Sequence, residues 1–268
     1  MALFIVSTPI GNLEDISARA LRVLREVQLI AAEDTRVTRK LLSRYDIHTR
    51  LMAYHEHNKL YAGARILRAL DGGDVALVSD AGTPVLSDPG EDLIRTAIGL
   101  GIDVVAIPGP SAILHALTVS GLPAEPFLFL GFLPSSRKER HQRLAGVADL
   151  EATLVIFEAP HRVRQTLQEL AELLGDRRVA VCRELTKLHE QVIRTRLPAA
   201  AGEVPERGEF TLVVEGAPPP AAFDEEAALD RLRGCLAEGM TKKAAIARVA
   251  AELDLPRKQV YRLALSLS

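Results

Sequence analysis

Short apolar runs alternate with helical patterns over the first 120 residues of the chain. The runs are LFIVS, LIAAE, RLMAY, DVALVSD and DVVAIPG, and segments such as ISARALRVLREV between them carry apolar residues at helical spacing. Strands that alternate with helices form parallel βαβ units. Because the runs are apolar throughout, we expect strands that are buried on both faces between layers of helices.

The pattern changes after about residue 120. The later apolar runs are FLFLGFL, TLVIFEAPHR, RVAVCRELTK, EQVIRTR and EFTLVVEG, and the last of them lack intervening helices, which predicts a mixed sheet. Three short helical patterns follow a Pro/Ala-rich linker, GAPPPAAFDEE. The predicted fold class is α/β, with a parallel-sheet domain over 1–120, a second α/β domain over 121–217 and a small helical unit over 224–268.

Composition narrows the class of protein. The chain has 268 residues, 48% of them hydrophobic, and a formal net charge of -2, so it has no uniformly basic surface and would meet a polyanion through local patches. Cys182 and Cys235 lack zinc-ligand spacing, and His55 and His57 have no evident third ligand, so no metal is expected. The N-terminal apolar stretch is too short for a signal peptide, and no run approaches a membrane span. We expect a cytoplasmic protein.

Unusual loops leave the predicted strands of the first domain. They read STPIGNLED, AAEDTR, AYHEHN, SDAGTPVLSDPG and IPGPSA. The carboxyl ends of parallel strands share one edge of the sheet, so these loops should meet in one ligand-binding crevice. Their Gly and Pro residues either let the backbone approach a ligand or simply form turns. A dinucleotide site is poorly supported, because the chain has neither GxGxxG nor a Walker lysine at the first loop.

Several polar side chains stand at these strand ends. Asp15 precedes a helical pattern and is expected to cap it. Glu33 and Asp34 are adjacent on an extended backbone, so their side chains point apart; one can pair with Arg36 or cap the next helix. A direct functional role for this pair is the alternative.

Two clusters in the second domain could carry chemistry. FEAPHRV places Glu158, His161 and Arg162 where a strand turns into a helix, and CRELTKLHEQ places Lys187 at another strand end. Histidine can act as a base, and arginine can hold an anion. Each cluster also has a structural alternative: the residues of FEAPHRV could belong to a helix N-terminus, and those of CRELTKLHEQ could form a surface ion-pair network.

Basic residues gather in two places. From Met240 onward six cations oppose two acids, which suggests contacts with RNA phosphates or, equally, a solvated helical cap. A second basic cluster consists of Arg137, Lys138, Arg140, His141 and Arg143. It shifts the balance slightly toward RNA.

Eight motifs in order, from STPIGNLEDIS, AAEDTR and YHEHN through VSDAGTPVLSDPG and IPGPSA to FEAPHR, RELTKLHE and GEFTLVVEG, resemble the tetrapyrrole methylase family. Within that family they are similar to the bacterial branch that methylates a ribose of small-subunit ribosomal RNA. The resemblance spans nearly the whole chain. It implies two α/β domains with S-adenosylmethionine in the cleft between them, a homodimer, and 2'-O-methylation of a cytidine in ribosomal RNA or the assembled small subunit.

The resemblance also implies site residues. Those for the cofactor are Pro9, Gly11, Asp80, Ala81, Gly82, Ser111, Ala112, Phe157, Leu185, Ala217 and Pro218. Catalytic candidates are Glu158 or His161 as base and Arg162 or Lys187 as cation, with Asp80 and Glu33 as second choices. RNA-binding candidates are Arg36, Arg137, Lys138, Lys242, Lys243, Arg257 and Lys258.

Two other functions are left open at this point. The porphyrin-modifying relatives have GxGxGD in the first loop and GDP after the fourth strand, whereas this chain has TPIGN and SDAGTP. This departure argues against the first alternative, a tetrapyrrole (precorrin-type) C-methyltransferase. The second is a non-catalytic RNA-binding protein that keeps the fold.

Overall fold

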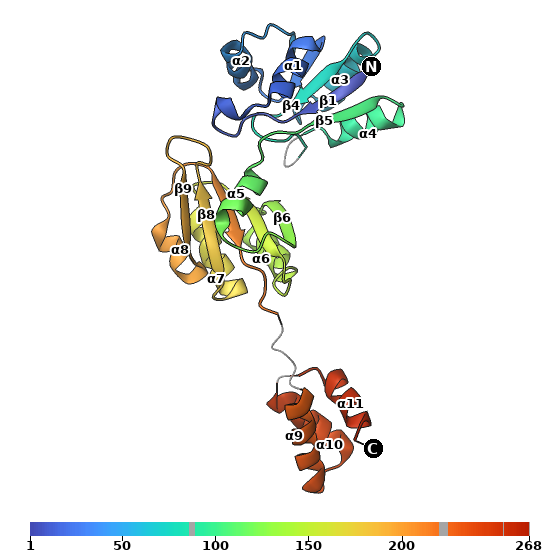
Figure 1. Cartoon of the computed structure of the whole chain (residues 1–268), viewed down its shortest axis with the longest axis vertical. Helices are drawn as coiled ribbons and strands as arrows, with labels where there is room; N and C mark the ends of the chain where they lie inside the picture. Colours follow the sequence, from blue (N-terminus) through green and yellow to red (C-terminus); the bar gives the residue numbers. More distant parts are fainter. Residues whose placement is uncertain (86–88, 220–224, 254, 268) are drawn as a thin grey trace. The chain divides into compact units, whose positions relative to one another are not determined.

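A computed structural model describes residues 1–85, 89–219, 225–253 and 255–267 (Figure 1). Part of the predicted loop 79–90 and part of the predicted linker, together with Asp254, lie outside these described residues. The chain divides into two compact units, Met1–Ala217 and Pro218–Ser268. No helix of the described residues is long and apolar enough to cross a membrane.

The first sheet is parallel, as the apolar runs predicted. Its strands are β1 (Ala2–Val6), β2 (Leu29–Ala32), β3 (Leu51–Ala53), β4 (Val75–Val78) and β5 (Asp103–Ile107), in the order β3-β2-β4-β1-β5. Alternate residues of one strand face opposite helical layers. Ile30 and Ala32 pack with α1 (Ala18–Glu26) and α2 (Thr35–Arg44), whereas Leu29 and Ala31 pack with α3 (Lys59–Leu70) and α4 (Glu91–Gly99). The predicted burial on both faces is confirmed for β2 and β4, in which every residue is buried, whereas the edge strands β3 and β5 are half-buried or exposed at most positions.

The caps of the first helices differ in part from the expectation. Asp15 does not cap α1, because it belongs to a short 3₁₀ helix, η1 (Leu13–Asp15); the cap is Ser17, whose hydroxyl accepts a hydrogen bond from the Ala20 amide at 3.1 Å. Asp34 caps α2 and also pairs with Arg36, whose Nη2 lies 2.6 Å from an Asp34 carboxylate oxygen.

The second sheet is mixed. Its strands are β6 (Phe127–Phe132), β7 (Thr153–Glu158), β8 (Arg178–Arg183), β9 (Gln191–Arg196) and β10 (Phe210–Val214), in the order β6-β7-β10-β8-β9. Only β6 and β7 run parallel among these neighbours. One face packs with α6 (Arg137–Ala145), α7 (Val163–Leu174) and α8 (Leu197–Glu203).

A helix from the first half of the chain covers the other face of this second sheet. In α5 (Ala112–Ser120), Ile113, Ala116 and Leu117 pack against Val155 of β7 and Cys182 of β8 (Figure 1). The expected domain boundary at residue 120 falls after α5, whereas its packing groups this helix with the second sheet.

The C-terminal unit contains α9 (Glu225–Ala237), α10 (Lys242–Glu252) and α11 (Arg257–Leu265). Its core includes Leu232, Val249 and Val260, each fully buried. The Thr241 hydroxyl caps α10 by accepting a hydrogen bond from the Ala244 amide at 3.3 Å, and Pro256 immediately precedes α11.

Candidate functional site

The loops after β1 and β4 are joined by their backbones. Thr8 and Gly82 exchange two backbone hydrogen bonds of 2.8 and 3.0 Å, and the Thr8 hydroxyl donates to the Ser79 carbonyl at 3.1 Å. Gly82 has a φ of 79°, and a Cβ there would meet the Ile10 side chain at 3.3 Å, so the position favours glycine. These contacts fix the carboxyl edge of the first sheet.

A cavity of about 510 Å³ lies at this edge and is also lined by the second sheet. The volume is within the usual range for small-molecule sites, about 300–1,000 Å³. The first sheet and α5 contribute Ile10, Glu33, Asp80, Ala81, Gly82, Thr83, Ser111, Ala112 and Ile113. The second sheet contributes Phe132, Phe157, Glu158, Ala159, Pro160, Leu185, Glu209, Phe210 and Thr211.

Most of the residues that the resemblance assigned to a cofactor lie at this cavity. The described lining includes Asp80, Ala81, Gly82, Ser111, Ala112, Phe157 and Leu185. Pro9 and Gly11 do not belong to this lining but flank its member Ile10 in the sequence. Gly11 contacts the loop that follows β8, because a Cβ at Gly11 would lie 2.9 Å from the Thr186 hydroxyl and 3.1 Å from the Leu185 carbonyl.

Ala217 and Pro218 do not lie at this cavity. β10 is antiparallel to β7, so its first residue, Phe210, pairs with Glu158 at the cavity edge, while Val214 pairs with Leu154 at the opposite edge. Ala217 follows Val214, and its amide donates to the Leu150 carbonyl. The expected position of Ala217 and Pro218 over the ligand is therefore corrected by the direction of β10.

The charges of the cavity are all negative. Glu33, Asp80, Glu158 and Glu209 line it, and no Lys, Arg or His belongs to the described lining. Burial raises the pKa of Glu33, and the neighbouring Asp80 carboxylate raises it further. One Asp80 carboxylate oxygen accepts a hydrogen bond of 2.9 Å from the Asp34 amide. Such a cavity suits a cationic ligand and disfavours a phosphate.

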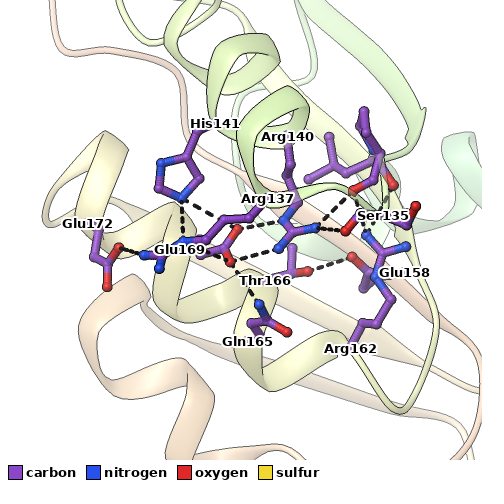
Figure 2. Close-up of polar contacts among 12 residues, drawn as sticks. Ser135, Arg137, Arg140, His141, Glu158, Arg162, Gln165, Thr166, Glu169 and Glu172 are labelled. Atoms are coloured by element: carbon purple, nitrogen blue, oxygen red, sulfur yellow. Dashed lines mark hydrogen bonds and ion pairs between the residues drawn. The ribbon is translucent and has the colours of Figure 1, made fainter.

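Glu158 is held from inside the second domain (Figure 2). One carboxylate oxygen accepts a hydrogen bond from the Ala159 amide at 2.8 Å and faces Arg162 at 3.5 Å. The other accepts from the Thr166 hydroxyl at 2.6 Å, and the Glu158 side chain is fully buried. With both oxygens engaged, the carboxylate is placed to fix the β7–α7 turn rather than to receive a proton from a ligand.

The other catalytic candidates, Arg162, His161 and Lys187, differ in their surroundings. Arg162 donates from one Nη to the carbonyls of Leu133 and Pro134, so it holds the segment after β6 (Figure 2). His161 is exposed and does not belong to the described lining. Burial acts to lower the pKa of Lys187, but hydrogen bonds to Glu184 and Glu209 raise it overall.

A buried ion pair supports the same segment. Arg140, expected as part of a basic surface, is only 3% exposed and makes two hydrogen bonds of 2.5 and 2.7 Å to Glu169. It also donates to the carbonyls of Pro134 and Ser135 (Figure 2). The basic cluster on α6 is therefore smaller than the sequence indicated.

The RNA-binding candidates are placed on helix surfaces. Arg137 is exposed but pairs with Glu172 at 3.4 Å, Lys138 is exposed, and Arg36 is exposed beside Asp34. The tail candidates lie in the first turns of their helices and are exposed; they are Lys242, Lys243, Arg257 and Lys258.

Sequence reasoning missed several lining residues. Phe132 stands in the apolar run FLFLGFL, which carried no chemical signal, while Phe210 and Thr211 start β10 and Glu209 immediately precedes it. The signal for Glu209, Phe210 and Thr211 was the GEFTLVVEG motif, but its charged second residue, Glu209, became informative only once the strand direction was known.

Comparisons with known proteins agree with this architecture. The family described as Tetrapyrrole (Corrin/Porphyrin) Methylases matches residues 2–201, and the RsmI C-terminal HTH domain, a helix-turn-helix unit, matches residues 223–268. Among solved structures, diphthine synthase has a TM-score of 0.64 at 14% identity and covers 81% of this chain and 90% of its own, which shows a shared fold.

Two similar relatives are both named ribosomal RNA small subunit methyltransferase I. The protein from Halalkalibacterium halodurans is 45% identical over 97% of this chain and 93% of its own length. The protein from Thermotoga maritima is also 45% identical, over 80% of this chain and 98% of its own length. The chain therefore belongs to the tetrapyrrole methylase family, within the group of ribosomal RNA small subunit methyltransferase I proteins.

Proposed function

We propose that this protein methylates the 2'-hydroxyl of a cytidine in small-subunit ribosomal RNA, with S-adenosylmethionine as methyl donor. The observation that carries the proposal is 45% identity over nearly the full length of a ribosomal RNA methyltransferase, both α/β domains and helical unit included. We further propose that the protein acts in the cytoplasm as a homodimer. Its substrate is naked RNA or the assembled subunit.

The cavity fits this methyl donor. When bound, the cofactor supplies an electrophilic methyl group on a cationic sulfur. The described lining residues include carboxylates and no cation, which suits the positive charges of the cofactor. The aromatic rings of Phe132 and Phe157, whose centroids lie 5.7 Å apart, give an apolar wall for a purine. The backbone hydrogen bonds between Thr8 and Gly82 hold the two loops of the cavity together.

The geometry also favours one proton acceptor over another. A ribose hydroxyl is a weak acid, so a carboxylate that takes its proton assists the transfer. Glu158 is engaged at both oxygens, whereas Glu33 is half-buried at the cavity, with a raised pKa. We therefore propose that Glu33 accepts the proton of the ribose hydroxyl and that Glu158 and Arg162 are positioning groups.

The test incubates the purified protein with labelled S-adenosylmethionine and small ribosomal subunits that lack the modification. Nucleoside analysis of the RNA is expected to find label on a ribose-methylated cytidine. Naked ribosomal RNA in a parallel reaction separates the two substrate forms. Label on a base, or no label in either substrate while the cofactor binds, would overturn the assignment.

A further inference from the structure

Helix α2, which starts two residues after the cavity residue Glu33, carries a row of cations. Arg36, Lys40 and Arg44 lie at successive four-residue steps, with Arg39 beside them, and all four are exposed. Residues four apart share one face of a helix. At 1.5 Å of rise per residue, this cationic stripe extends about 12 Å.

Within the stripe Arg36 pairs with Asp34, whereas Arg39 and Lys40 lack the glutamate partners that cations on other surface helices have among the described contacts. α2 contains no acidic residue, and like charges four apart destabilise a helix. By contrast, glutamates four residues away pair with Arg22 in α1, Arg95 in α4 and Arg248 in α10. Among the contacts of the described residues, Arg39 and Lys40 take part in no hydrogen bond or ion pair. Nearby acids are already engaged: Asp34 holds Arg36, and Asp46 pairs with His48.

A hydrogen bond connects the start of α2 to the cavity. Its cap, Asp34, donates its amide to the cavity carboxylate Asp80 at 2.9 Å, and Glu33 immediately precedes it. The hydrogen bond to Asp34 is the main cause that raises the pKa of Arg36, and Asp80 is close enough to raise it further. A polyanion that follows the stripe would therefore arrive at the cavity.

We propose that the stripe formed by Arg36, Arg39, Lys40 and Arg44 binds the phosphate backbone of the substrate RNA next to the target nucleotide. This inference rests on the proposed function and adds an RNA contact on the first α/β domain. Phosphate contacts position a nucleic acid without reading its sequence. The partner is RNA rather than an acidic protein, because cations at a regular spacing match the repeating charge of a phosphate backbone.

The variant Arg39→Gln/Lys40→Gln tests this assignment. For a single strand, each phosphate contact contributes a slope of about -0.7 in log K against log salt, so the variant should show a slope shallower by about 1.4. If the variant and the unaltered protein bind equally at about 1 M salt, this difference in slope predicts that the variant binds about 25-fold more weakly at about 0.1 M salt. Binding to unmodified small subunits is measured over about 50 to 200 mM salt, with thermal unfolding as the check of folding.

Arg65→Gln/Arg68→Gln is the matched control. It removes the same charge from exposed positions of α3, which covers the opposite face of the first sheet. Its subunit affinity and salt slope should equal those of the unaltered protein. If the unaltered protein methylates RNA but the α2 and α3 variants bind subunits equally well, the proposed RNA-binding role of the stripe is wrong. Weakened binding to subunits but not to deproteinised RNA would assign the stripe to a protein partner, and failure of the unaltered protein to methylate RNA would overturn both proposals.

Discussion

Glu33 and Asp80 end neighbouring strands of the first sheet and bring two carboxylates into one cavity. The pKa of Glu33 is raised from its ordinary value of 4.5, first by burial and then by Asp80. The folded state therefore holds this proton more tightly than the unfolded chain does. The associated stability is present below pH 4.5 and is lost as the pH rises through the folded-state pKa.

The substitution Glu33→Gln is expected to raise the melting temperature at pH 7, because it removes an ionised group that burial disfavours. The difference should shrink as the pH falls below 4.5, where both side chains are neutral. Methyl transfer should be lost in the variant, and in the unaltered protein it should decline as the pH falls through the raised pKa. Calorimetry and labelling across pH provide the measurements. Glu14→Gln, at an exposed acid of η1, is the control, and a melting point unchanged at pH 7 would contradict the prediction for Glu33.

Helices α6 and α7 are joined by the buried pair of Arg140 and Glu169, which also supports the segment after Phe132. Hydrogen bonds from Arg140 lower the pKa of Glu169. We expect Arg140→Met to lower the free energy of unfolding by about 3–5 kcal/mol, because the buried Glu169 carboxylate loses its two short hydrogen bonds and keeps only Gln165 and longer contacts to Arg137 and His141. Urea unfolding at pH 7 measures this loss.

The double variant Arg140→Met/Glu169→Met should recover most of that loss, since it removes the unpaired charge as well. Arg137→Gln removes an exposed arginine that pairs with Glu172 at 3.4 Å and, at a longer 3.8 Å, with Glu169, and it should cost less than about 1 kcal/mol. A double variant as unstable as Arg140→Met alone would show that the carbonyl contacts of Arg140, and not its pairing with Glu169, dominate.

The sequence predicted individual elements better than their partners. Continuous apolar runs identify strands buried on both faces, and this gave the parallel first sheet. The pattern AILHALTVS predicts a helix at α5, but it does not say which sheet the helix covers. Similarly, the segment RKERHQR is typical of a solvent-facing basic segment. Arg140 is nevertheless buried, because it pairs with Glu169, a residue 29 positions further along the chain that the segment itself does not reveal.

The site was predictable in so far as it depends on strand ends. Asp80 and Gly82 follow β4, and a parallel sheet places such loops at one edge. Glu209 and Thr211 could not be found in this way, because they lie at the start of an antiparallel strand, Glu209 just before β10 and Thr211 within it. The same reversal moved Ala217 to the far edge of the second sheet.

The two compact units have separate hydrophobic cores. The described core of the C-terminal unit contains only residues from Ala228 onward, and the α/β unit ends at Ala217. The relative from Thermotoga maritima aligns with 80% of this chain over 98% of its own length, and the α/β unit is 217 of 268 residues, or 81%. The α/β unit alone therefore has about the length of that whole relative.

A chain that ends at Ala217 should fold and bind S-adenosylmethionine with the affinity of the full chain, because the cavity lies within the α/β unit. Its affinity for small ribosomal subunits should fall. If all four exposed tail cations contact phosphates, the salt slope should become shallower by about 3. The full-length variant with Gln at Lys242, Lys243, Arg257 and Lys258 should reproduce this slope, which separates the effect of charge from the loss of the unit. Calorimetric titration of the cofactor and salt-dependent binding of subunits provide the two readouts, and a quadruple variant that binds subunits normally would exclude the tail cations as RNA contacts.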